Sequence, residues 1–240
     1  MLHLLRIQKI ILLLVILCVS TQSYAQREWN RPDHDNWPYY FGMTLGYTRS
    51  SLHTNKSTTF IQNDSIYTVE PGAGGGITLG LLGTLKLSNR FEVRANPQLI
   101  VGGARTFTYR VKYPFAGQPE VTTQTLPSTI VSFPFQVKFN SDRIDNFRVY
   151  MLAGIKYDID LASNNSVRNA ENLVKLRRSD YGVDVGIGFN FYLPFVTVSP
   201  EIKFSNGLAN IHARDAALKF SNVLDRLNSQ MITFSLHLED

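Results

Sequence analysis

The chain has 240 residues, is 44% hydrophobic and carries 24 basic against 19 acidic residues. So mild a charge balance argues against a nucleic-acid partner, and a single cysteine excludes an internal disulfide. The length suits one all-β domain after removal of a leader.

Residues 1–25 have the organisation of a secretory signal peptide. A short basic region with Arg6 and Lys9 precedes an aliphatic run at residues 10–19, and the small residues Ser23 and Ala25 mark the expected cleavage site. The run is too short for a spanning helix, which argues against the alternative of a membrane anchor. Cleavage after Ala25 removes the cysteine and leaves 22 basic and 19 acidic residues, a net charge of +3.

Residues 26–38 (QREWNRPDHDNWP) form a polar lead-in to the first predicted strand. The segment contains two prolines and two tryptophans, Trp29 and Trp37. We expect it to lie in the periplasm, either as a flexible lead-in or as a contact for periplasmic partners.

Apolar residues alternate with small or polar ones along much of the mature chain. The stretch DYGVDVGIGFNFYLP shows the pattern clearly, because residues 181–193 are apolar or aromatic at every odd position. Such period-two alternation predicts strands with one apolar face. Eight strands are predicted, at residues 39–48, 76–87, 91–104, 129–139, 147–161, 181–193, 196–205 and 231–238.

The predicted connections are alternately short and long. The short ones cover residues 88–90, 140–146 and 193–194, and the long ones cover residues 50–75, 105–128, 162–180 and 206–230. Short turns at one end and long loops at the other are typical of outer-membrane barrels, whose turns are periplasmic and whose loops are extracellular. The predicted fold is therefore an all-β, eight-stranded antiparallel up-and-down transmembrane barrel spanning residues 39–240.

The composition of the second face decides which way the apolar face points. A soluble barrel would bury the apolar face and expose a face rich in Lys and Glu, but here the second face is mostly Gly, Ser, Thr and Asn. Its charges have both signs, as a mutually neutralising interior requires. The proposed lumen network consists of Lys86, Glu92, Arg94, Lys138, Arg148, Lys156, Asp158, Asp160, Asp184, Glu201 and Lys203.

Aromatic residues near the predicted short turns suggest one interfacial girdle. Its members are Phe41, Phe91, Phe139, Phe147, Phe191 and Phe195. Three prolines, Pro97, Pro134 and Pro200, fall inside predicted strands. Because proline cannot donate to a ladder and a closed barrel has no edge, bulges are expected at all three.

The last long loop contains a segment with helical spacing. Phe220, Val223, Leu224 and Leu227 follow an i, i+3, i+4, i+7 pattern, with Asp215 as N-cap, which predicts a short amphipathic helix. The helix either packs over the barrel mouth or docks a partner.

Other chemical signals are few. Lys175, Arg177 and Arg178 form a basic cluster that either contacts lipopolysaccharide or is simply solvated. His212 and Asp215 share a loop, but no spacing singles out a serine for them to activate. No histidine or carboxylate group has metal-ligand spacing. The sequence therefore predicts no catalytic residue, metal, cofactor or small-molecule substrate.

Several stretches resemble one known family. YGVDVGIGFNFYLPFVTVSPEIKFSNGLANI, FSNVLDRLNSQMITFSLHLED and SFPFQVKFNSDRIDNFRVYMLAGIKYDIDLAS are similar to the PorT (SprT) family of Bacteroidetes outer-membrane proteins. The resemblance implies a component of the type IX secretion system, needed for protein export and often linked to gliding motility. It carries over no catalytic or ligand residues.

The width of the predicted barrel limits that role. Eight strands enclose an interior that side chains can fill, so an assembly or scaffold partner of other secretion components is favoured over a pore. The alternatives are a generic small outer-membrane barrel with a surface-binding or envelope-stability role, or a narrow solute porin.

Overall fold

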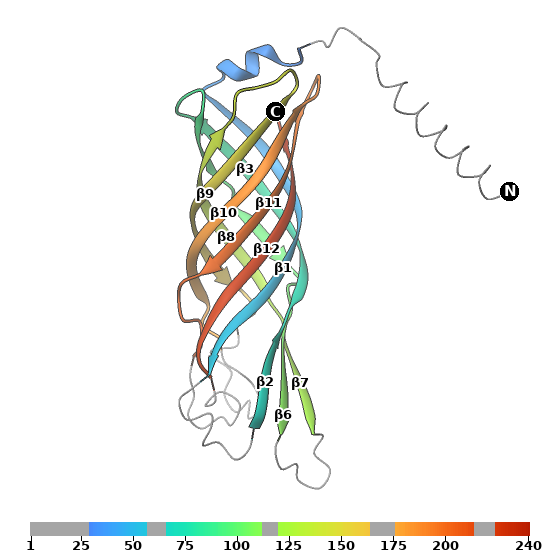
Figure 1. Ribbon diagram of the computed structural model, residues 1–240, viewed down its shortest axis with the longest axis vertical. Helices are drawn as coiled ribbons and strands as arrows, with labels where there is room; N and C mark the ends of the chain where they lie inside the picture. Colours follow the sequence, from blue (N-terminus) through green and yellow to red (C-terminus); the bar gives the residue numbers. More distant parts are fainter. Residues whose placement is uncertain (1–28, 57–65, 112–119, 164–175, 214–223) are drawn as a thin grey trace, which may run out of the picture.

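One antiparallel sheet curls until its first strand meets its last (Figure 1). The computed structural model describes residues 29–56, 66–111, 120–163, 176–213 and 224–240. The sheet contains β1 (Tyr39–Lys56), β3 (Gly74–Lys86), β4 (Phe91–Ala95), β5 (Gln98–Val101), β8 (Thr129–Asn140), β9 (Phe147–Asp160), β10 (Ser179–Tyr192), β11 (Thr197–Gly207) and β12 (Leu224–Glu239).

The closure is complete because β1 pairs antiparallel with both β12 and β3. Strands β4 and β5 both pair with β3 on one side and β8 on the other, in one continuous register, so they are two halves of a single barrel strand. The nine segments therefore make eight barrel positions, and the predicted eight-stranded antiparallel barrel is confirmed.

The predicted bulges at the prolines are wrong. The register is unshifted across Pro97, Pro134 and Pro200, and the missing donors are accommodated by short gaps in the ladder, of which the one at Pro200 lies between β10 and β11. Pro97 and Pro134 share one gap, where β4 ends and β5 begins opposite β8, and Asn96 still donates its N–H to the Pro134 carbonyl at 3.3 Å. Because the two prolines lie in the same gap, both strands keep the same number of residues across it, and no extra residue forms a bulge.

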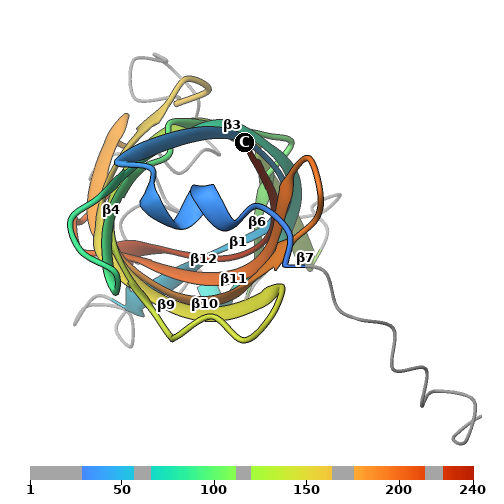
Figure 2. The same ribbon diagram turned by 90° about the horizontal axis from the view of Figure 1, so that it is seen from above.

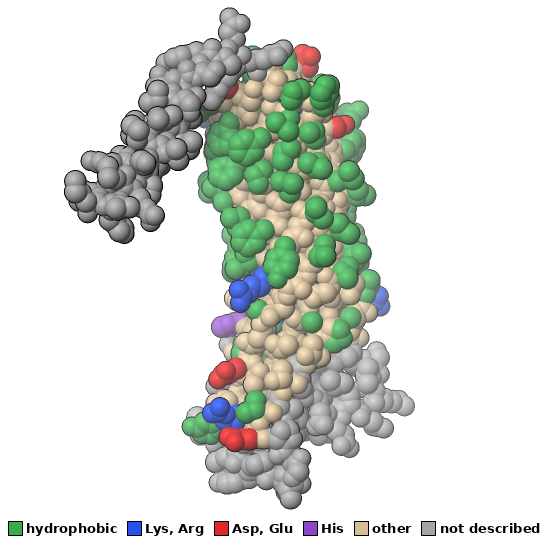
Figure 3. Space-filling model, turned by 90° about the vertical axis from the view of Figure 1, so that its right-hand side faces the viewer, with side chains coloured by type: hydrophobic (Ala, Val, Ile, Leu, Met, Phe, Trp, Pro, Cys, Tyr) green, Lys and Arg blue, Asp and Glu red, His purple; other side chains and the backbone are tan. Residues whose placement is uncertain are grey.

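The two faces of the barrel differ as sharply as the alternation predicts. On β10 the burial alternates residue by residue: Val185 is 51% exposed while the neighbouring Asp184 is 1% exposed. Every barrel strand contributes exposed large apolar side chains. On the face seen in Figure 3 they gather over the upper part of the barrel. An apolar surface of this extent is stable against hydrocarbon, not against water.

Aromatic residues lie at both ends of this surface. At the short-turn end Phe91 packs on Phe139, and Phe147 packs on Phe191, each pair with ring centroids 5.2 Å apart. A second set at the long-loop end was not predicted, and it consists of the exposed Tyr47, Tyr157 and Tyr181.

A small second sheet continues beyond the barrel at the long-loop end (Figure 1). It is formed by β2 (Ile66–Gly72), β6 (Arg105–Val111) and β7 (Val121–Leu126), all inside segments predicted to be loops. A buried apolar cluster fixes this end, and it consists of Leu52, Val69, Phe107, Tyr109, Leu126, Leu176, Ile211 and Leu227.

The predicted helix in the last long loop is wrong where the structure describes it. Leu224 and Leu227 belong to β12, which pairs with the extension of β1, and the Leu227 side chain is fully buried in the apolar cluster. Extending the barrel ladder satisfies these backbone groups and outweighs a local helical pattern. Phe220, Val223 and the proposed cap Asp215 lie outside the described residues.

The lead-in folds back over the opposite end. It contains the short 3-10 helix η1 (Pro32–Asn36), which lies across the short-turn mouth of the barrel (Figure 2). Among the described residues, no helix is long and apolar enough to span a membrane.

Candidate functional site: the filled interior and its closures

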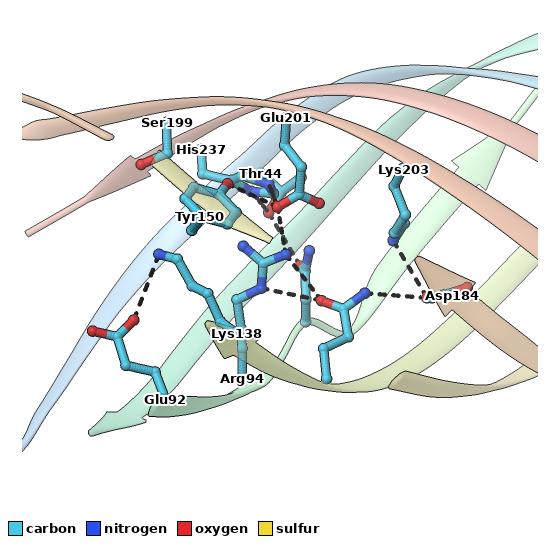
Figure 4. Close-up of polar contacts among 12 residues, drawn as sticks. Thr44, Glu92, Arg94, Lys138, Tyr150, Asp184, Ser199, Glu201, Lys203 and His237 are labelled. Carbon is cyan, nitrogen blue, oxygen red and sulfur yellow. Dashed lines mark hydrogen bonds and ion pairs between the residues drawn. The ribbon is translucent and has the colours of Figure 1, made fainter. Parts of the chain in front are cut away.

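An ion pair between β4 and β11 lies at the centre of the barrel interior (Figure 4). The Arg94 guanidinium lies 2.5 Å from a Glu201 carboxylate oxygen, and both side chains are fully buried. Arg94 also donates two hydrogen bonds to Gln136 Oε1, at 2.9 and 3.1 Å. A buried charge pair needs such additional bonds to offset its desolvation.

Gln136 extends this contact to a second ion pair. Its amide nitrogen donates to Asp184 Oδ2 at 3.1 Å, and Lys203 Nζ lies 3.8 Å from the same oxygen. Asp184 therefore has a lysine partner from the neighbouring strand β11, as its position on the inner face of β10 requires.

A third pair lies toward the short-turn end. Lys138 Nζ is 3.6 Å from Glu92, and Tyr40 donates its hydroxyl to the same carboxylate at 2.8 Å. Lys138 also lies over the Tyr150 ring, 4.1 Å from its centroid, while the Tyr150 hydroxyl donates to Glu201 at 2.8 Å. Tyr150 thus connects the Glu92 pair to the Arg94 pair.

One glycine makes room for that tyrosine. A β-carbon on Gly188 would lie 2.3 Å from Tyr150 Cζ and 2.9 Å from the Pro200 carbonyl oxygen. A side chain at this position would therefore displace the tyrosine from Glu201.

His237 also contacts this central cluster. Its Nε2 lies 3.3 Å from Glu201, and its Nδ1 is 2.9 Å from the Thr44 hydroxyl. Four members of the cluster were not among the predicted lumen residues, although period-two alternation places each on the inner face. These are Tyr40, Gln136, Tyr150 and His237.

The charges near the long-loop end form a separate group. Lys156 pairs with Asp158, which also accepts a hydrogen bond from Ser132. Asp160 accepts from the Ser128 hydroxyl at 3.1 Å. Ten of the eleven proposed lumen residues are buried. Six of them form one central group that Gln136 and Tyr150 connect, while Lys156, Asp158 and Asp160 lie apart from it toward the long-loop end.

Two unpredicted residues complete this end. The buried Asp180 accepts a short hydrogen bond from Ser229, and the buried Arg105 donates to the Ser50 hydroxyl at 2.9 Å. Together with the apolar cluster beyond them, these contacts close the long-loop end of the lumen.

The remaining two proposed lumen residues bind the lead-in. Lys86, which is only partly buried, donates to the carbonyl oxygens of His34 and Asp35 at 3.2 and 2.7 Å. Arg148 forms an ion pair with Asp35 at 3.2 Å. The short-turn end is therefore closed by residues of the lead-in.

The lead-in carries a buried histidine, His34, from which we expect a pH dependence of docking. His34 contacts three rings, with centroid distances of 5.5 Å to Trp37, 4.9 Å to Tyr40 and 5.7 Å to Tyr192. Neither of its ring nitrogens has a hydrogen-bond partner among the described residues. Burial, and then the nearby cations Arg31 and Lys86, lower the pKa of His34 from 6.5 to about 4, against smaller opposing effects of Asp35 and Glu92.

We expect docking of the lead-in to weaken as the pH falls from about 6.5 to about 4. In this range the released histidine binds a proton and the docked one does not, which makes docking less favourable by at most about 3 kcal/mol. Fluorescence of Trp37 in a Trp29→Phe background should report the transition. His34→Gln should remove it, and an unchanged pH profile in that variant would assign the transition to another group.

Other proposed functional residues lie apart from the interior. Arg177 and Arg178 are exposed at the long-loop end, and Lys175 lies outside the described residues. His212 is buried beside Leu176, while its proposed partner Asp215 is not described. Within the described ranges, no cluster of three or more His, Cys, Asp or Glu side chains could hold a metal ion.

A closed barrel with an apolar outer surface and a filled polar interior defines a small integral membrane barrel. The chain belongs to the family described as "Outer membrane protein beta-barrel domain", which matches residues 24–213. It is therefore an outer-membrane protein.

Several solved barrels are similar in fold. Ail, the attachment invasion locus protein of Yersinia pestis, in complex with the heparin analogue sucrose octasulfate, is 12% identical, with 85% of this chain and 100% of that chain covered and a TM-score of 0.40. Neisserial surface protein A is 9% identical, with coverages of 82% and 95% and a TM-score of 0.40. OprG of Pseudomonas aeruginosa is 14% identical, with coverages of 82% and 94% and a TM-score of 0.40. No curated protein matches the chain.

Proposed function

We propose that this protein is a non-enzymatic component of the type IX secretion system that acts as an assembly or scaffold partner and not as the pore. The observation that carries the non-pore role is the filled interior, with Arg94, Glu201 and Lys138 fully buried at its centre. An extended polypeptide cannot pass an eight-stranded barrel whose lumen holds such side chains. The link to secretion rests on the sequence resemblance to the PorT family.

The proposed orientation follows the usual arrangement of outer-membrane barrels. Short turns face the periplasm and long loops face outward, so the lead-in and the C-terminus are periplasmic. The leader is removed after Ala25. The exposed Arg177 and Arg178 then lie on the outer side, where they are available to lipopolysaccharide phosphates.

Deletion of the gene tests the proposal. We expect cargo proteins of the type IX system to accumulate inside the cell and gliding or protease secretion to be lost, with rescue by the intact gene. Normal export in the deletion strain would contradict the proposal.

A surface-binding or envelope-stability role is the second candidate. The observation that favours it is the three-stranded sheet β2–β6–β7, which extends beyond the apolar belt at the loop end and presents the exposed residues Glu70, Arg110 and Thr123. Loss of surface adhesion or increased detergent sensitivity, with normal export, would support this role. A narrow solute porin is disfavoured by the same filled interior.

A further inference from the structure

The lead-in is held at the short-turn mouth mainly by charge. The Asp35 carboxylate bridges two arginines. Arg143, in the turn after β8, lies 3.0 Å from one of its oxygens, and Arg148, in β9, lies 3.2 Å from the other. The Arg143 and Arg148 side chains are only 3% and 10% exposed, so these cations are largely removed from water by the segment that they bind.

Four further hydrogen bonds from the mouth go to main-chain carbonyls of the lead-in, while the Asn30 and Arg31 side chains donate to the carbonyl oxygens of Tyr192 and Glu239 and to the Thr197 hydroxyl. Lys86 donates to the carbonyls of His34 and Asp35, and Arg143 donates to the carbonyls of Asn30 and Arg31. Main-chain carbonyls are present in any peptide. The mouth therefore recognises a carboxylate and the main-chain carbonyls of the short helical turn that carries it, and Asn30 and Arg31 add side-chain contacts.

One ring position adds selectivity. Arg143 lies over the Tyr192 ring at 3.8 Å from its centroid, and the His34 ring packs against Tyr192 and Tyr40. The mouth therefore favours a planar side chain, here His34, at the position directly before the acidic residue Asp35.

The lead-in is not an optimal occupant of the mouth. Among its described residues, 29–38, His34 alone has a buried side chain, while Trp29 is 58% exposed and Trp37 is 39% exposed. Arg31 has φ 51°, in the left-handed region, which costs of order 1 kcal/mol for a residue with a β-carbon. Little apolar burial and one strained residue make the segment displaceable.

We propose that the short-turn mouth is a binding site for an acidic peptide segment of a periplasmic partner, and that residues 29–37 occupy this site in cis. The periplasmic location of the partner rests on the orientation given under the proposed function. Because the tethered segment has a high effective concentration, a partner binds only where its segment is the better ligand or the tethered one has been loosened.

Peptide binding to the full-length protein tests this site. The probe is a fluorescein-labelled peptide of residues 29–38 (WNRPDHDNWP), measured by anisotropy with the protein in detergent micelles. Asp35→Asn removes the tethered carboxylate, and we expect this variant to bind the peptide at least tenfold more tightly than the unmodified protein. The same peptide with Asn in place of Asp35 should lose at least tenfold in affinity.

Variants of the mouth make the result specific. Adding Arg148→Gln to Asp35→Asn should abolish the gain in peptide affinity. If that double variant does not fold, Arg143→Gln combined with Asp35→Asn replaces it. Arg90→Gln is the matched control, because Arg90 lies at the same end but pairs with Asp142 and not with the lead-in. Heat-modifiable migration on a gel confirms that each barrel is folded.

Two outcomes would overturn the site: no tighter binding by Asp35→Asn, or binding that the arginine substitutions leave unchanged. Neither outcome depends on the export assay, so the peptide-site proposal and the secretion proposal can be rejected independently of each other.

Discussion

Arg94→Ala is expected to lower the free energy of unfolding of the barrel by about 3–5 kcal/mol. The substitution leaves Glu201 charged, fully buried and without its arginine partner at 2.5 Å. It also removes the donor of two hydrogen bonds to Gln136, which links this pair to Asp184. Urea unfolding of the protein in lipid vesicles, followed by heat-modifiable gel migration, measures the loss.

Two control variants separate loss of the ion pair from a general loss of charge. Arg94→Leu combined with Glu201→Leu should recover most of the stability, because a buried pair is often replaceable by apolar residues. Arg90→Ala breaks an exposed pair with Asp142 and should cost less than about 1 kcal/mol. Equal losses for Arg94→Ala and Arg90→Ala would contradict a buried interior pair.

Ile187→Arg is expected to destabilise the membrane-inserted barrel by about 2–4 kcal/mol. Ile187 points outward near the middle of β10, between Tyr181 and Phe191, and pairs with Met151 and Ile202. A guanidinium at this height lies in hydrocarbon. Unfolding in lipid vesicles of defined thickness measures the effect.

Ser179→Arg is the matched control on the same strand and the same outward face. It lies beyond Tyr181, at the loop end of β10, and should cost at most about 1 kcal/mol. A soluble barrel would tolerate both substitutions, so a neutral Ile187→Arg would contradict a lipid-facing surface.

The period-two pattern predicted the barrel because a strand between lipid and a polar interior must place its apolar side chains on one face and its polar side chains on the other. The inward position of Asp184 beside the outward Val185 followed from that rule alone. Pairing partners did not follow from it, because contacts such as Gln136 with Asp184 depend on which strands are neighbours and on their register.

The errors have particular causes. Strands β2, β6 and β7 lie within segments predicted to be loops, although RTFTYRV and VTTQTL are rich in residues that favour strands. Residues 224–227 showed helical spacing, yet pairing with β1 decided their conformation. Capping by the lead-in had no local signal, since Asp35 and its partner Arg143 are far apart in the sequence.

The lumen is filled with buried side chains, and we propose that the protein acts by contact and not by conduction. Planar-bilayer recording of the pure, folded protein tests this most directly. We predict no stable conductance steps, and the same result after His34→Gln, because the buried pairs of Arg94 with Glu201 and Lys138 with Glu92 remain in place behind the lead-in. A large, stable open channel would contradict the claim.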